Sequence, residues 1–167
     1  TQGLEGTMFL AAWLRRNNLE ELLRLNLHGN LAYLDRFQPR GRDYLAAKPH
    51  GLVAMWMAGN VATLPMFSLV PGLLTKNVCL VKLAQPQPEG IDRLLAVLAE
   101  AGAEGLGGHD LLEAAAVVWF DYQEPGLSDA MSRAGDAKVI WGGSPAIEAI
   151  TRLPRPEHCV EIVFGPK

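Results

Sequence analysis

The stretch Leu52-Val53-Ala54-Met55-Trp56-Met57-Ala58-Gly59-Asn60 decides the fold of this chain. Its first six residues are continuously apolar and of strand length. Such a run is typical of a strand that is covered on both faces of a parallel sheet. We therefore predict a buried strand here, with Ala58, Gly59 and Asn60 as its connection to the next element.

Further apolar runs alternate with helical patterns along the rest of the chain. They predict strands over 78–83, 116–120, 137–141 and 159–164, and helices over 61–74, 91–98, 127–131 and 145–152. Ser144 is expected to cap the last helix, with Pro145 at its first position. Pro71 predicts a kink or an early stop in the first of these helices. Five strands alternating with helices predict an α/β fold, a Rossmann-like parallel sheet with helices on both faces.

Residues 1–50 are predicted to form a helical N-terminal extension before this sheet, which would occupy residues 51–167. Asn18 is the expected cap of one helix, with Glu21 in the capping-box position, and Gly29-Asn30 is expected to end it. Residues 39–41 are interpreted as a loop.

The composition is that of an ordinary globular domain and excludes several classes of protein. Of 167 residues, 49% are hydrophobic and 20% charged, so disorder is a poor interpretation. A net charge of −3 argues against a nucleic-acid-binding surface, and no apolar run reaches the roughly 18 residues of a membrane span. Two cysteines suggest a reducing, cytoplasmic setting. The ends at Thr1 and Lys167 suggest a piece of a longer protein.

Ligands of an open parallel sheet bind beyond the carboxyl ends of its strands, and this rule selects three places. At Ala58-Gly59-Asn60, a glycine allows close approach and Asn60 offers an amide donor, although Asn60 also suits a helix N-cap. Lys82 ends the second predicted strand, where it could meet a phosphate or ribose hydroxyls, or be an ordinary surface lysine. Gly142-Gly143-Ser144-Pro145 precedes a helix and suits a pyrophosphate, but a plain tight turn fits equally well.

Other reactive side chains are weaker candidates. The four histidines show no metal-ligand spacing. Cys79 lies within a strand, where a small buried hydrophobic residue is expected, and Cys159 has no neighbour that clearly lowers its pKa. We predict no nucleophile, base and acid set among these residues.

The sequence around these three places is similar to that of a known family. The stretches that carry the comparison are 52–61, 68–83, 141–147 and 164–167, of which Gly72-Leu73-Leu74-Thr75-Lys76-Asn77-Val78-Cys79-Leu80-Val81-Lys82-Leu83 is the most specific. From about Leu14 onward the chain resembles the fatty acyl-CoA reductases of the LuxC type, which belong to the aldehyde dehydrogenase superfamily.

The resemblance implies a role for each place. Asn60 would stabilise the oxyanion of a thiohemiacetal. Lys82 would reach the adenosine ribose or its 2′-phosphate, and the turn at Gly142, Gly143 and Ser144 would lie under the cofactor pyrophosphate. The implied reaction reduces an acyl-CoA to an aldehyde through a cysteine thioester, with NADP as cofactor (NAD being possible). The catalytic cysteine would lie in a separate domain beyond Lys167, and a homo-oligomer is possible.

One departure from the superfamily favours acyl-CoA reduction over aldehyde oxidation. Val163 stands where the dehydrogenases carry a glutamate that activates water, and Glu161 lies two residues earlier. Transfer of an acyl group from a CoA thiol needs no activated water. Two alternatives stay open: a non-catalytic dinucleotide-binding or interaction module, and an aldehyde dehydrogenase acting on free aldehydes.

Overall fold

The computed structural model describes residues 2–86, 90–103 and 105–166. The chain divides into two compact units, residues 1–49 and 50–167. Each unit is described by itself below.

The first unit is helical and ends in a hairpin. Its elements are α1 (Gln2–Trp13), α2 (Arg16–Asn26), a 3₁₀ helix η1 (Leu31–Leu34), and the antiparallel strands β1 (Gln38–Arg40) and β2 (Asp43–Leu45). The predicted loop at 39–41 is therefore mostly strand and turn.

The prediction that Asn18 is the N-cap of α2 is wrong. Asn18 lies inside the helix, and its side-chain amide donates to the carbonyl of Ala12 at 2.8 Å, whereas Arg15 occupies the cap position. The helix also ends at Asn26, before Gly29-Asn30, because His28 and Gly29 adopt positive φ angles that no helix continues. Asn30 instead caps η1 by accepting from the amide of Ala32.

The second unit contains the predicted five-stranded parallel sheet. Its strands are β3 (Leu52–Trp56), β4 (Val78–Lys82), β7 (Ala115–Val118), β8 (Ala137–Trp141) and β9 (Val160–Phe164). They lie in the order β7-β4-β3-β8-β9, and every neighbouring pair is parallel. The chain thus builds outward from β3 in one direction and then in the other. Between β3 and β8 the order reverses, which is where doubly wound sheets open a crevice at the carboxyl ends of their strands.

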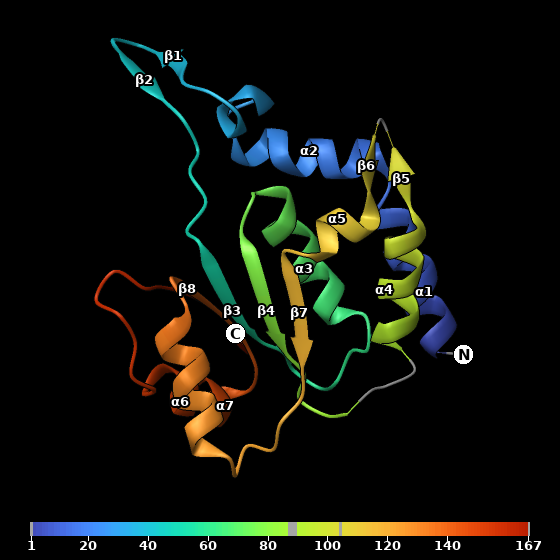
Figure 1. Cartoon of the computed structure of the whole chain (residues 1–167), viewed down its shortest axis with the longest axis vertical. Coiled ribbons are helices and arrows are strands. Elements are labelled where there is room, and N and C mark those ends of the chain that lie inside the picture. Colours follow the sequence, from blue (N-terminus) through green and yellow to red (C-terminus); the bar gives the residue numbers. More distant parts are fainter. Residues whose placement is uncertain (1, 87–89, 104, 167) are drawn as a thin grey trace. The chain divides into compact units, whose positions relative to one another are not determined.

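Helices cover both faces of this sheet, as predicted. α3 (Leu64–Leu74), α4 (Ile91–Glu100) and α5 (Gly108–Leu112) connect strands in one direction, whereas α6 (Pro125–Ala134) and α7 (Ser144–Thr151) connect strands in the other. Right-handed crossovers place these two sets on opposite faces, and Figure 1 shows α3 and α4 across the sheet from α6 and α7.

Alternate residues of β3 supply the two cores. A Cβ on Gly72 of α3 would collide with Cys79 and Met55, so α3 packs closely on that face. On the other face, Ala54 and Trp56 form a buried cluster with Met131 of α6. Because β3 is buried on both sides, its sequence is continuously apolar.

Some predicted element ends differ in the structure. α3 begins at Leu64, which places Pro65 in its first turn, where proline is tolerated, and it runs past Pro71 to Leu74 without the early stop that Pro71 predicted. α7 begins at Ser144 with Gly143 as N-cap, so Ser144 is not its cap. The short pair β5 (Gly102–Ala103) and β6 (Leu106–Gly107) is antiparallel and was not predicted, because two-residue strands carry no periodic signal.

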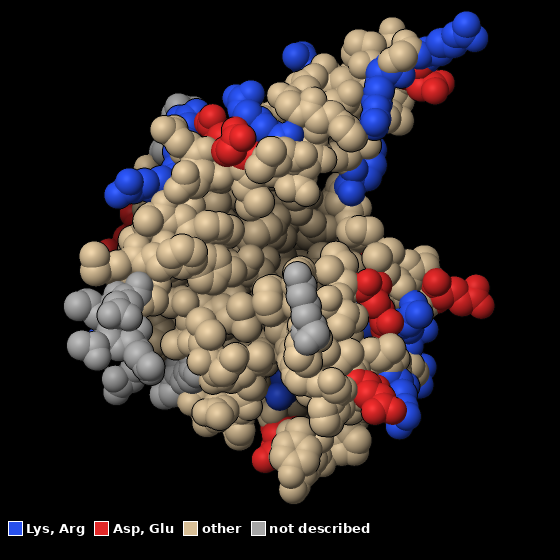
Figure 2. All heavy atoms as spheres, turned by 180° about the vertical axis from the view of Figure 1, so that it is seen from behind, with Lys and Arg blue, Asp and Glu red and all other residues tan. Residues whose placement is uncertain are grey.

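The surface is mixed in charge. On the face drawn in Figure 2, acidic side chains lie among the Lys and Arg side chains, with large uncharged areas between them. None of the helices in the described part of the chain is long and apolar enough to cross a membrane. This face shows no broad surface of one charge, so a binding site for a specific ligand is expected in a cavity.

Candidate functional site

A cavity of about 660 Å³ opens at the carboxyl ends of β3, β4 and β8, on the face covered by α6 and α7. Its walls are mostly apolar, with one lysine and a glycine turn among them, which is the usual character of a small-molecule site. The lining residues are Trp56, Met57, Ala58, Gly59, Lys82, Ala84, Tyr122, Pro125, Ser128, Trp141, Gly142, Gly143, Pro145, Ala146, Ala149, Ile150 and Leu153.

The glycine turn brings the start of α7 to this cavity. Gly142 follows β8 directly and its amide donates to the carbonyl of Phe164 at 3.2 Å, while Ile147 donates to Gly143 at 3.1 Å to close the first turn of α7. The amides ahead of Ile147 have no carbonyl within the helix to bind, and Pro145 has no amide hydrogen. The positive end of the helix therefore faces a hollow in which an anion would be stabilised.

Gly143 is not required by the fold itself. Its φ of −75° is open to any residue, and a Cβ placed there would meet only the Cδ of Pro145, at 3.9 Å. Gly142 is tighter, because a Cβ would come within 3.1 Å of the Cβ of Ala146. The open space over Gly143 is thus what a ligand that approaches the backbone closely would need.

Lys82 reaches this cavity from the end of β4. Its side chain is only 9% exposed, so the ordinary surface lysine that the sequence left open is not what the structure contains. The Nζ atom lies 5.1 Å from the ring centroid of Phe120, a cation–π distance. Burial lowers the pKa of Lys82, and the nearby Asp121 carboxylate opposes that effect. An anionic ligand would stabilise the charged form.

The structure does not place the other predicted residues at this cavity. Asn60 is exposed in the loop after β3 and does not line it, although Gly59 beside it does. Asn60 is also not a helix cap, because Thr63 precedes α3. Ser144 lines a second, more open hollow of about 650 Å³ between α7 and the end of β9.

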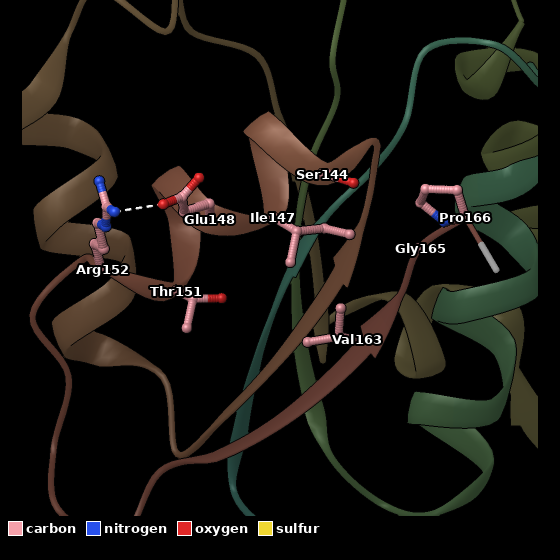
Figure 3. A pocket seen from close by; sticks show the side chains of 8 residues that line it. All are labelled: Ser144, Ile147, Glu148, Thr151, Arg152, Val163, Gly165 and Pro166. Carbon is pink, nitrogen blue, oxygen red and sulfur yellow. Dashed lines mark hydrogen bonds and ion pairs between the residues drawn. The ribbon is translucent and has the colours of Figure 1, made fainter.

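Figure 3 shows that second hollow, where the Ile147 side chain lies between Ser144 and Val163. Glu148 and Arg152, one helical turn apart, form an ion pair at its side. Val163 is therefore a lining residue of this hollow and contributes no titratable group.

Glu161 belongs to an ion-pair cluster that sequence reasoning missed. Its Oε1 lies 3.4 Å from the Nζ of the fully buried Lys138 and 3.3 Å from the Nε of Arg155. Lys138 also lies 3.3 Å from the carbonyl of Leu153, just beyond the end of α7. A lysine inside an apolar strand was the available signal, because a charge in that position needs a partner.

The residues after β7 were also missed as part of the site. β7 ends at Val118, two residues earlier than predicted, so Phe120 lies in the loop. The Phe120 ring contacts the Lys82 ammonium, and the Asp121 carboxylate acts to raise the pKa of Lys82. Tyr122 lines the cavity. The sequence shows an aromatic-rich segment at 119–122, but only the pairing of β4 with β7 brings this segment close to Lys82.

Neither cysteine is suited to nucleophilic chemistry. Cys79 is fully buried, and burial raises the pKa of its thiol to about 11. Cys159 is 4% exposed, and burial raises the pKa of its thiol as well. Among the described residues no group of three or more His, Cys, Asp or Glu is arranged to hold a metal ion.

The doubly wound sheet, the helix N-terminus at a glycine turn and the buried lysine define an α/β protein with a cavity suited to an anionic ligand. The sequence model of the family described as acyl-CoA reductase (LuxC) matches residues 2–167, and the chain belongs to this family.

Several curated bacterial proteins are similar to the chain. Long-chain acyl-protein thioester reductase of Aliivibrio fischeri is 29% identical over 140 residues, which cover 83% of this chain and 28% of that protein. Long-chain acyl-protein thioester reductase 2 of Photobacterium leiognathi is 28% identical over 135 residues (80% and 27%), and the reductase of Photorhabdus luminescens is 26% identical over 153 residues (91% and 31%). The chain thus spans less than a third of the length of these relatives.

Proposed function

We propose that residues 51–167 are the dinucleotide-binding domain of an acyl thioester reductase, with residues 1–50 as an extension of it. The observation that carries this proposal is the meeting of Lys82 and the Gly142-Gly143 turn on one cavity at the reversal point of the sheet. The family and the names of the relatives support a reductase that acts on an acyl thioester.

The lining of the cavity offers a place for the pyrophosphate, the adenosine ribose and the base of a dinucleotide. The pyrophosphate would lie over Gly143 at the N-terminus of α7, where a Cβ would otherwise stand. The adenosine ribose would lie near Lys82 at the end of the second strand of the sheet, which is where this class of fold holds it. The apolar side chains of Pro125, Ile150 and Leu153 would then contact the base.

The chemistry that follows is reduction at the thioester carbon. A bound nicotinamide dinucleotide would supply hydride to that carbon; the carbon–sulfur bond would break to leave an aldehyde and a thiolate, and the thiolate would take a proton from solvent. We assign the Asn60 amide, which is exposed in the loop between β3 and α3, to the oxygen that gains charge in this step. The thioester-forming cysteine is assigned to the part of the relatives that this chain does not span, and the superfamily is that of the aldehyde dehydrogenases.

Reduction is favoured over oxidation of free aldehydes by the position of Glu161. Oxidation needs a base that activates water, and Val163 cannot serve as one. Glu161 is 15% exposed and lies within 3.4 Å of both Lys138 and Arg155. Its carboxylate is paired with these two cations at a place that is not on the cavity lining, so it is poorly placed to act on a bound substrate.

The proposal is tested by titrating NADPH into the protein and following the fluorescence of NADPH. Gly143→Ala places a methyl group where the pyrophosphate is proposed to lie, and we expect it to weaken binding about tenfold or more, the equivalent of about 1.4 kcal/mol. NADH is titrated in parallel to compare the two cofactors.

Gly90→Ala is the matched control, because Gly90 is also a helix N-cap glycine whose added Cβ would meet nothing within 4 Å. Both variants should unfold within a few degrees of the parent, since each changes only a cap by less than about 1 kcal/mol. Equal NADPH affinity in the two variants would remove the turn from the site.

A further inference from the structure

We infer that Asp121 is a specificity-determining residue that sets how strongly the site distinguishes a phosphate from a hydroxyl at position 2′ of the adenosine ribose. This inference deepens the proposed function and rests on it. It concerns Lys82 at the end of β4 and the loop after β7, in which Phe120 contacts that lysine and Asp121 follows.

The pairing of β4 with β7 creates this arrangement. Lys82 is opposite Val118, and the amide of Leu83 donates to the carbonyl of Val118 at 2.9 Å, so both strands end at the same level. Two residues later the Phe120 ring lies 5.1 Å from the Lys82 ammonium. Asp121 follows directly in the chain, between Phe120 and Tyr122, and Tyr122 lines the same cavity as Lys82.

The Asp121 carboxylate is held in place by a local turn. Its Oδ1 accepts a hydrogen bond from the amide of Gln123 at 2.9 Å, while the side chain as a whole is exposed. Its charge is close enough to raise the pKa of Lys82 against the effect of burial. A ligand group that meets the lysine therefore meets the field of this carboxylate too.

The two charges act in opposite directions on a 2′-phosphate. Lys82 attracts it, whereas Asp121 repels it and can instead accept a hydrogen bond from a free 2′-hydroxyl. A site that carried the lysine alone would favour the phosphorylated ribose strongly. With Asp121 present the preference is reduced, and both cofactor forms can be used.

The experiment compares two adenosine probes that differ only at this position. Binding of 2′,5′-ADP and of 5′-AMP to the full chain is measured by calorimetry for the parent, Asp121→Asn and Asp92→Asn. Asparagine keeps the Oδ1 acceptor for Gln123 and removes only the charge. Asp92→Asn removes the same charge from the first turn of α4, on the opposite face of the sheet.

For Asp121→Asn we expect the ratio of 2′,5′-ADP affinity to 5′-AMP affinity to rise about three- to tenfold, as loss of one partly solvated like charge implies. The ratio for Asp92→Asn should equal that of the parent. An unchanged ratio in Asp121→Asn, with both probes bound, would overturn the inference and leave the proposed function standing. Failure of the parent to bind either probe would overturn both.

A second variant separates direct repulsion from an effect through the lysine. Lys82→Met should lower the affinity for 2′,5′-ADP more than that for 5′-AMP. Adding Asp121→Asn to Lys82→Met should still raise the ratio, because the carboxylate acts on the phosphate itself. If the double variant showed no such rise, Asp121 would act only by tuning Lys82 and its assignment as a specificity-determining residue would fall.

Discussion

Gly51 and Asp136 meet at the amino end of the sheet, opposite the cavity. Gly51 has a φ of +118°, and a Cβ on it would collide with Oδ2 of Asp136. That oxygen accepts from the amide of Leu52 at 2.8 Å, while Oδ1 lies 2.9 Å from Nε2 of His158. Asp136 thus joins the starts of β3, β8 and β9, and only glycine leaves room for it.

This contact makes stability depend on pH in a predictable way. The hydrogen bond with His158, and next that with Leu52, lower the pKa of Asp136 below its ordinary value of 3.8. A carboxyl with a lowered folded pKa contributes stability above its ordinary pKa and loses it as pH falls through the lowered value. For Asp136→Asn we therefore expect a lower thermal midpoint at neutral pH and a difference from the parent that shrinks below about pH 5.

Thermal melts of both proteins across the acid range check this prediction. Asp43→Asn serves as the control, because Asp43 is exposed in β2. Its difference from the parent should be small throughout. A deficit of Asp136→Asn that stayed constant down to the lowest pH would show that the charge of Asp136 contributes nothing.

At the level of elements, Lys138 links β8, β9 and α7. Its ammonium lies within 3.5 Å of the carbonyls of Ile150 and Leu153 and 3.4 Å from Glu161. A cation near the last carbonyls of a helix is stabilised by them, and it also compensates the buried carboxylate. Lys138 therefore fixes the C-terminal end of α7, the helix whose N-terminus faces the cavity.

Removing Lys138 alone leaves the partly buried Glu161 carboxylate with Arg155 as its cationic partner, and it takes a donor away from the carbonyls of Ile150 and Leu153. We expect Lys138→Met to lower the free energy of unfolding by about 3 kcal/mol, measured by denaturant titration. The double variant Lys138→Met/Glu161→Leu should recover part of that loss, because both charges are then gone. If the double variant were no more stable than the single one, the ion pair would not be the cause of the loss.

Element types could be predicted from the sequence because each depends on local pattern. The five strands are apolar runs, and their approximate positions need no knowledge of distant residues. Caps and ends were less predictable. Asn18 and Ser144 are good cap residues by type, yet the backbone turns at Arg15 and Gly143 decide where α2 and α7 begin.

At the level of the whole chain, the described residues that line the candidate cavity all belong to the second unit. We expect a protein of residues 50–167 to unfold cooperatively and to bind NADPH within about threefold of the full chain, since a compact unit with its own core can fold alone. Circular dichroism melts and the NADPH titration check this. A shortened chain that folds but binds tenfold more weakly would show that the first unit contributes to the site.

The amino-acid sequence was sufficient to establish the parallel sheet, its helices and two of the polar features at the carboxyl ends of its strands. These follow from periodicity and from glycine and lysine at the ends of apolar runs, which are properties of neighbouring residues. The three-dimensional arrangement was needed to unite Lys82 with the Gly142-Gly143 turn, to bring Phe120 and Asp121 to the lysine, and to place Ser144 at another hollow. The order of the strands and the level at which each strand ends determine which side chains meet. Both result from the packing of segments that are distant in the sequence, such as β3 and β8, where Val53 is paired with Ala137.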